Sequence, residues 1–206
     1  MPMLFMDTLD VWLDVLGATL IAVAYWLYLN FVSSQQQRAG FNKVFGLFLI
    51  SVGIYALASG IWAMATWPLP SSYNLVFSDA WPIFGVAALV LGLANYYNPE
   101  GDQVRAALVG IALLSLIPFV YGIAIWVFGL TNAPVIAGLM YFFIGLAGIL
   151  SPFATLKGLK RPLGILLLVL VLIAGIIALF TGIGAIFEHI PAWKAWAPWY
   201  GAVKTS

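Results

Sequence analysis

Long apolar runs dominate the hydrophobic pattern of this 206-residue sequence. Each run is about as long as a helix that crosses a bilayer, which takes about 20 mainly apolar residues. Charges or Pro, Gly and Asn turns bound six runs, which are Val11–Val32, Val44–Trp67, Ala80–Tyr97, Ala106–Leu130, Ala133–Leu156 and Pro162–Phe187. None alternates with the period of two that a transmembrane barrel strand shows. The pattern predicts an all-α polytopic membrane protein with six transmembrane helices.

The composition fits a protein embedded in a lipid bilayer and excludes several other classes. Charged residues make up 7% of the chain and hydrophobic residues 64%, whereas a soluble domain carries about 25% charged residues. A net charge of +1 without a cluster of Lys and Arg argues against a nucleic-acid partner. With no cysteine and one histidine, His189, we expect no metal site and no cofactor.

The basic residues predict the orientation of the chain. Six of the eight lie in or beside the loops after the first, third and fifth runs, namely Arg38, Lys43, Arg105, Lys157, Lys160 and Arg161. By the positive-inside rule these loops are cytoplasmic, so both termini are expected outside a cell membrane. The first run is too long for a signal peptide, and we expect it to remain in the mature protein.

The same loops show a repeated spacing of glycine and a basic residue. The segments Gly40–Gly46 and Gly158–Gly164 each place a basic residue midway between two glycines, and a looser copy surrounds Arg105. Because each basic residue opens the second helix of a pair, the repeat predicts three helical hairpins. A general need for glycine and one snorkelling cation in short inner turns explains the pattern equally well.

The chain divides into a six-helix transmembrane domain, residues 1–190, and a tail, residues 191–206. The tail places aromatic residues three or four positions apart, at Trp193, Trp196, Trp199 and Tyr200. Because indole rings favour the headgroup level, the tail is predicted to form a short interfacial helix at the outer leaflet.

The few polar residues at membrane depth form no catalytic set. His189 is expected in the tail, away from any buried serine, and no paired carboxylates, P-loop spacing or mid-helix lysine are found. We therefore expect no enzyme activity. The polar residues are interpreted as the lining of a solute pathway or as contacts between helices.

Polar positions in five of the runs are candidates for lining a pathway, and those in the first, second and fourth runs carry the hypothesis. Asp14 lies inside the first run and is expected to face an aqueous vestibule or a subunit contact, whereas Asp7 and Asp10 are expected to be solvated. In the second run a polar and aromatic stripe lines a solute route or serves close helix packing. In the fourth run Pro118 frees the Leu114 carbonyl and predicts a kink. The pathway-lining candidates are Asp14, Ser51, Tyr55, Ser59, Asn95, Ser115, Pro118, Tyr121 and Thr181.

Short segments of the core resemble a known family. They are Trp81–Gly85, Ala94–Tyr96, Ile117–Pro118 and Lys157–Gly164. In these segments the chain resembles the urea-channel and amide-transporter family. The resemblance implies six helices, outside termini and a narrow channel within each protomer of a hexamer. The chain departs from that family's pattern where Ala87, Ala88 and Val90 replace polar and aromatic side chains, and where Ala178, Leu179 and Thr181 replace a membrane acid. In layout and in the turn Gly129–Pro134 it is also similar to six-helix acetate and succinate transporters.

The sequence thus predicts a homo-oligomeric membrane channel or facilitator for a small polar or weakly ionised solute, such as urea, an amide or a short carboxylate. The alternative is a non-catalytic structural or accessory subunit of a larger membrane complex, such as a respiratory assembly, with other membrane subunits as partners.

Overall fold

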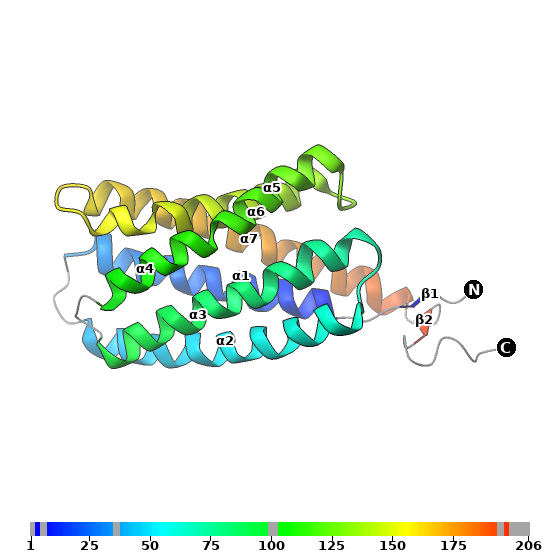
Figure 1. Ribbon diagram of the computed structural model, residues 1–206, viewed down its shortest axis with the longest axis horizontal. Coiled ribbons are helices and arrows are strands. Elements are labelled where there is room, and N and C mark those ends of the chain that lie inside the picture. The colour runs from blue at the N-terminus through cyan, green and yellow to red at the C-terminus, as the bar shows by residue number, and fades with distance from the viewer. Residues whose placement is uncertain (1–2, 5–7, 35–37, 99–102, 193–195, 198–206) are drawn as a thin grey trace.

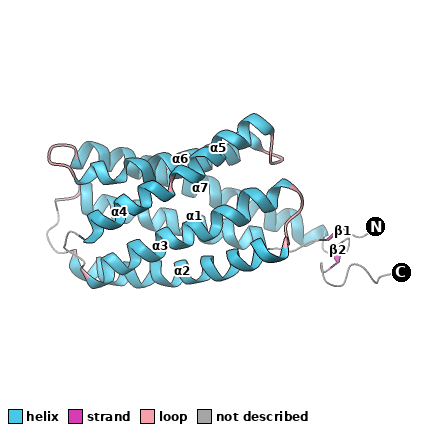
Figure 2. Ribbon diagram, in the orientation of Figure 1, coloured by secondary structure: helices cyan, strands magenta, loops and turns pink. Residues whose placement is uncertain are grey.

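The computed structural model describes residues 3–4, 8–34, 38–98, 103–192 and 196–197. The described chain is almost entirely helical (Figures 1 and 2). Its α-helices are α1 (Thr8–Leu27), α2 (Ala39–Thr66), α3 (Asp79–Tyr97), α4 (Gln103–Leu114), α5 (Leu116–Phe128), α6 (Pro134–Leu150) and α7 (Lys160–Ala192). Two π-helical turns, Tyr28–Val32 and Asn74–Ser78, and a 3₁₀ turn, Ser151–Thr155, extend α1, α3 and α6.

In the described residues, six helical segments are long and apolar enough to cross a membrane. They are Thr8–Val32, Ala39–Thr66, Asn74–Tyr97, Gln103–Phe128, Pro134–Thr155 and Lys160–Pro191. The prediction of an all-α membrane-embedded protein with six spans is confirmed at the level of length and composition. All six run lengthwise through the bundle, and the first and last described residues lie at the same end (Figure 1), which we call the terminal end.

The helices do not pair mainly through the predicted inner turns. The most extensive contacts join α2 with α3, α5 with α6, and α1 with α7. In Figure 1, α2 and α3 follow one edge of the bundle, α5 and α6 follow the other, and α1 and α7 lie between them. The main pairs are therefore formed across the loops at the terminal end and between the first and last spans.

Glycines allow the two helices of each pair to approach closely. A Cβ added to Gly53 of α2 would lie 2.8 Å from the backbone nitrogen of Leu89 on α3, so no side chain fits there. Each pair has such a contact: Gly53 with Gly85 in α2 and α3, Gly17 with Gly175 in α1 and α7, and Gly122 with Gly138 in α5 and α6. Small residues let transmembrane backbones approach closely, which strengthens dispersion contacts that lipid cannot replace.

The fourth span is kinked, as predicted from Pro118. Helix α4 ends at Leu114 and α5 begins at Leu116, so Ser115 forms the break. Proline has no N–H to donate to the carbonyl four residues earlier, and its ring pushes against that carbonyl. The break therefore falls at the residue after Leu114.

Two other predicted boundaries differ from the structure. The loop expected before Ala80 is helical over Asn74–Ser78, because the buried Asn74 side chain accepts hydrogen bonds from the Leu69 N–H (3.1 Å) and the Ser78 hydroxyl (3.2 Å). The predicted tail helix is wrong at Trp196–Ala197, whereas Pro191 and Ala192 are helical as the end of α7. Strand β2 (Trp196–Ala197) pairs in parallel with β1 (Met3–Leu4), and Pro198 disfavours a helical conformation of Ala197. The other tail aromatics, Trp193, Trp199 and Tyr200, lie outside the described residues.

Candidate solute cavity

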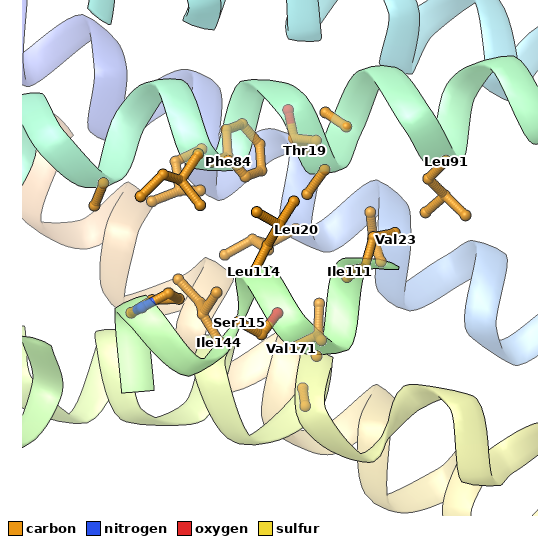
Figure 3. Close-up of a pocket in the computed structure, with 18 of the residues that line it drawn as sticks. Thr19, Leu20, Val23, Phe84, Leu91, Ile111, Leu114, Ser115, Ile144 and Val171 are labelled. Atoms are coloured by element: carbon orange, nitrogen blue, oxygen red, sulfur yellow. The ribbon is translucent and has the colours of Figure 1, made fainter. Parts of the chain in front are cut away.

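A cavity of about 180 Å³ lies inside the bundle (Figure 3). Every span contributes to its wall, and α1 contributes most of its length. The α1 lining begins at Leu9 near the terminal end and recurs every three or four residues to Leu27. At about 1.5 Å per residue, this stretch extends over about 27 Å. The lining therefore extends through most of a hydrocarbon core, which is about 30 Å thick.

The cavity wall is almost wholly apolar. None of the described side chains that line it carries a formal charge. Three lining hydroxyls are already used within the protein: Thr19 donates to the Val15 carbonyl (2.7 Å), Tyr141 to the Val76 carbonyl (2.8 Å) and Ser151 to the Gly148 carbonyl (2.8 Å). An ion would lose its hydration here without compensation, so the cavity suits a neutral molecule.

Stacked aromatic rings form the wall near the terminal end. Trp12 of α1 stacks on Trp81 of α3 with ring centroids 5.6 Å apart, and Trp81 stacks on Phe84 at 5.2 Å. All three line the cavity. Rigid rings in close contact fix the width of this end of the cavity.

A second aromatic group lies at the opposite end. Trp26 lines the cavity, is 1% exposed and stacks on Phe45 with centroids 6.0 Å apart. Its indole N–H donates to the Asn95 side chain over 2.9 Å, and the Asn95 amide donates to the Leu91 carbonyl. Asn95 is therefore a satisfied contact between α1 and α3 that positions Trp26 from behind the cavity wall.

The predicted stripe on α2 lies outside the cavity. Ser51 is exposed and donates to the Leu47 carbonyl of its own helix. Ser59 donates to the Tyr55 carbonyl and accepts the Trp81 indole N–H over 2.9 Å. The Tyr55 ring packs edge-on against Trp81, with centroids 6.2 Å apart. Ser59 and Tyr55 therefore lie behind the cavity wall, in contact with Trp81, and Ser51 is not among the described residues that line the cavity.

Of the other candidates, Ser115 and Pro118 line the cavity. Tyr121 donates its hydroxyl to the Asp79 carboxylate over 3.0 Å, between α5 and α3. Thr181 is exposed on α7 and donates to the Ile177 carbonyl. The structure thus brings two of the nine predicted residues to the cavity.

A family model matches residues 1–192 and so covers all six spans. The chain belongs to the DUF981 family. That family is described as a protein of unknown function. No curated protein and no solved structure matches the chain. For this DUF981 chain, a function must be argued from the geometry.

The DUF981 chain also has a polar contact that the sequence did not predict. His189 lies in the last turn of α7, and its Nδ1 is 2.5 Å from Oδ2 of Asp10 on α1. Asp10 is 2% exposed and His189 26%, so the expectation that Asp10 is solvated is wrong. The antiparallel contact of α1 with α7 brings together residues that are 179 positions apart. No local pattern marks such a pair.

Asp14 belongs to the same helix contact. It lies one turn below Asp10 on the α1 face that packs against α7, and its Oδ1 lies directly against Gly182. Asp14 is not among the described residues that line the cavity. In the described residues, no three His, Asp or Glu side chains converge in a way that could hold a metal ion.

Sequence reasoning predicted that the first helix lines the pathway, but through Asp14, and it missed the residues of α1 that line the cavity. These residues are mostly leucine and valine, which are equally common on a helix face toward lipid. The sequence did contain a signal for the cavity-facing side of α1, because Trp12, Thr19 and Trp26 lie at intervals of seven on one face of the helix. Such a heptad of bulky and polar residues in a transmembrane helix favours a face packed inside the protein.

Proposed function

We propose that this chain is a membrane facilitator that passes a small neutral solute along its central cavity. The observation that carries the proposal is the continuous α1 lining from Leu9 to Leu27, which extends over about 27 Å. A facilitator needs a pathway whose length approaches the thickness of the bilayer. Walls formed by every span of one chain supply such a pathway within a single protomer.

The chemistry of the wall narrows the class of solute. The absence of charged groups among the described lining residues disfavours ions, including ionised carboxylates. A volume of about 180 Å³ accommodates a molecule of a few heavy atoms, since an apolar cavity of about 150 Å³ holds benzene in another protein. The aromatic stacks near each end restrict the width. We therefore propose an uncharged solute of roughly the size of urea, a small amide or a short neutral acid.

Filling the cavity should stop transport. Ala87 lines the cavity on α3, whereas Val90, three residues later, is 38% exposed on the outer side of the same helix. An Ala87→Phe substitution should lower urea or acetamide flux into liposomes at least tenfold, since its ring occupies the pathway. A Val90→Phe substitution adds a ring to the same helix outside the cavity and should leave the flux unchanged. Stopped-flow light scattering of proteoliposomes measures both.

Comparison of the Ala87→Phe and Val90→Phe variants also tests the alternative function, that of an accessory subunit. Thermal unfolding and size-exclusion profiles of the two variants show that each is folded. Equal flux through folded Ala87→Phe and the parent protein would contradict the proposed pathway and favour an accessory subunit of a membrane complex. In that case, purification from its native membrane should recover other subunits.

We further propose that the terminal end faces outward across a cell membrane, because six of the eight basic residues lie at the opposite end. The chain has no native cysteine, so labelling is specific. A Ser206→Cys variant should react with a membrane-impermeant thiol reagent in intact cells, and a Ser34→Cys variant only after permeabilisation. The reverse pattern would place the termini inside.

A further inference from the structure

The break in the fourth span leaves a backbone acceptor at membrane depth. Helical hydrogen bonds continue around it, from the Ser115 N–H to the Ile111 carbonyl (2.8 Å) and from the Phe119 N–H to the Ser115 carbonyl (3.2 Å). The Leu114 carbonyl lacks its helical donor, because the residue four positions later is Pro118. A helical carbonyl points toward that fourth residue, and Leu114 and Pro118 both line the cavity. The free acceptor therefore lies on the cavity side of the span.

A free hydroxyl lies beside this carbonyl. The Ser115 side chain lines the cavity, is 7% exposed and makes no hydrogen bond within the described chain. Its oxygen packs against Gly148 of α6. Figure 3 shows Leu114 and Ser115 together on the kinked span. A buried hydroxyl without a partner costs about 1–3 kcal/mol, so this position is unfavourable unless a ligand completes it.

We propose that the Leu114 carbonyl and the Ser115 hydroxyl form the hydrogen-bonding site that selects solutes in the cavity. The carbonyl accepts a hydrogen bond from the solute, and the hydroxyl donates one to it. A solute with one donor and one acceptor on a compact polar group is fully paired at this site. The Trp12 indole N–H is a further donor without a hydrogen-bond partner among the described residues, and Trp12 lines the cavity near its terminal end. Elsewhere, additional polar groups on a solute would face an apolar wall or hydroxyls that are already bonded. This inference rests on the proposed function.

Binding of a solute at the Leu114 and Ser115 site can be measured without a transport assay. An Ala87→Cys substitution introduces one thiol into the cavity of a chain that has no other. A small neutral methanethiosulfonate should modify this thiol, and a bound solute should slow the modification. N-methylformamide, which has one N–H and one carbonyl, and N,N-dimethylformamide, which lacks the N–H, are matched probes.

N-methylformamide should protect the Ala87→Cys thiol about threefold to tenfold better than N,N-dimethylformamide, the range expected for one hydrogen bond. Addition of Ser115→Ala should weaken protection by N-methylformamide by a similar factor, and Ser115→Thr, which keeps the hydroxyl, should restore it. Ser151→Ala is the control, because Ser151 also lines the cavity at 7% exposure but already donates to the Gly148 carbonyl. It should leave protection unchanged.

Two results would overturn the inference. One of them would also overturn the proposed function, and the other would not. If the reagent does not reach the Ala87→Cys thiol, the cavity is closed to solutes and the proposed function fails as well. If the reagent reaches the thiol but both probes protect it equally, with or without Ser115→Ala, the selective site is wrong and the facilitator remains.

Discussion

A Gly53→Ala substitution should lower the free energy of unfolding by about 1–3 kcal/mol, the usual cost of overpacking a tight contact. The added Cβ would lie 2.8 Å from the Leu89 nitrogen and 2.9 Å from the Gly85 carbonyl oxygen. These are backbone atoms of α3, so only separation of the two helices relieves the clash. The midpoint of thermal unfolding in mild detergent measures the loss.

Gly110→Ala is the matched control. Gly110 lies within α4, and a Cβ there would meet nothing within 4 Å. Because alanine favours a helix over glycine by up to about 1 kcal/mol, this substitution should leave stability unchanged or raise it. Equal destabilisation by the two substitutions would mean that glycine serves helix flexibility rather than the contact between α2 and α3.

Removal of His189 should cost about 3 kcal/mol of stability. In a His189→Leu variant the carboxylate of Asp10, 2% exposed, loses the ring nitrogen that lies 2.5 Å away. Loss of one partner of a buried pair costs about 3–5 kcal/mol, and the lower end applies because His189 is 26% exposed. Thermal unfolding compared with Glu188→Leu, an exposed neighbour on the same turn, measures this cost.

A double variant distinguishes a lost partner from lost packing. Asp10→Leu combined with His189→Leu removes both polar groups and should regain most of the stability, because apolar replacement of a whole buried pair is often neutral. Additive losses in the double variant would show that the two residues act independently.

Much of the fold follows from the sequence because the bilayer imposes a simple rule. Each span must be long, apolar and helical, since an unpaired backbone group in lipid is costly. The kink at Ser115 follows equally from Pro118, through the chemistry of one missing N–H. These features depend on local residues alone.

The sequence does not predict in the same way which helices pair or which residues line the cavity. Glycine at Gly17 or Gly53 permits a close contact but does not specify which helix makes it. Ser51 and Ser59 are two turns apart on α2, yet only Ser59 contacts the cavity wall through Trp81. Cavity-facing leucines on α1 are chemically the same as lipid-facing ones. Such distinctions arise from the tertiary arrangement.

The contact of α1 with α7 has a consequence for biosynthesis. A ribosome delivers the first span long before the last, so the nascent chain holds Asp10 and the glycine face of α1 in the membrane without their partner. Helices α2 and α3, and likewise α5 and α6, are consecutive and can associate as soon as both have been inserted. The first span of the bundle to be made is therefore the last to gain its main partner, and assembly of the bundle is complete only after the sixth span has been inserted.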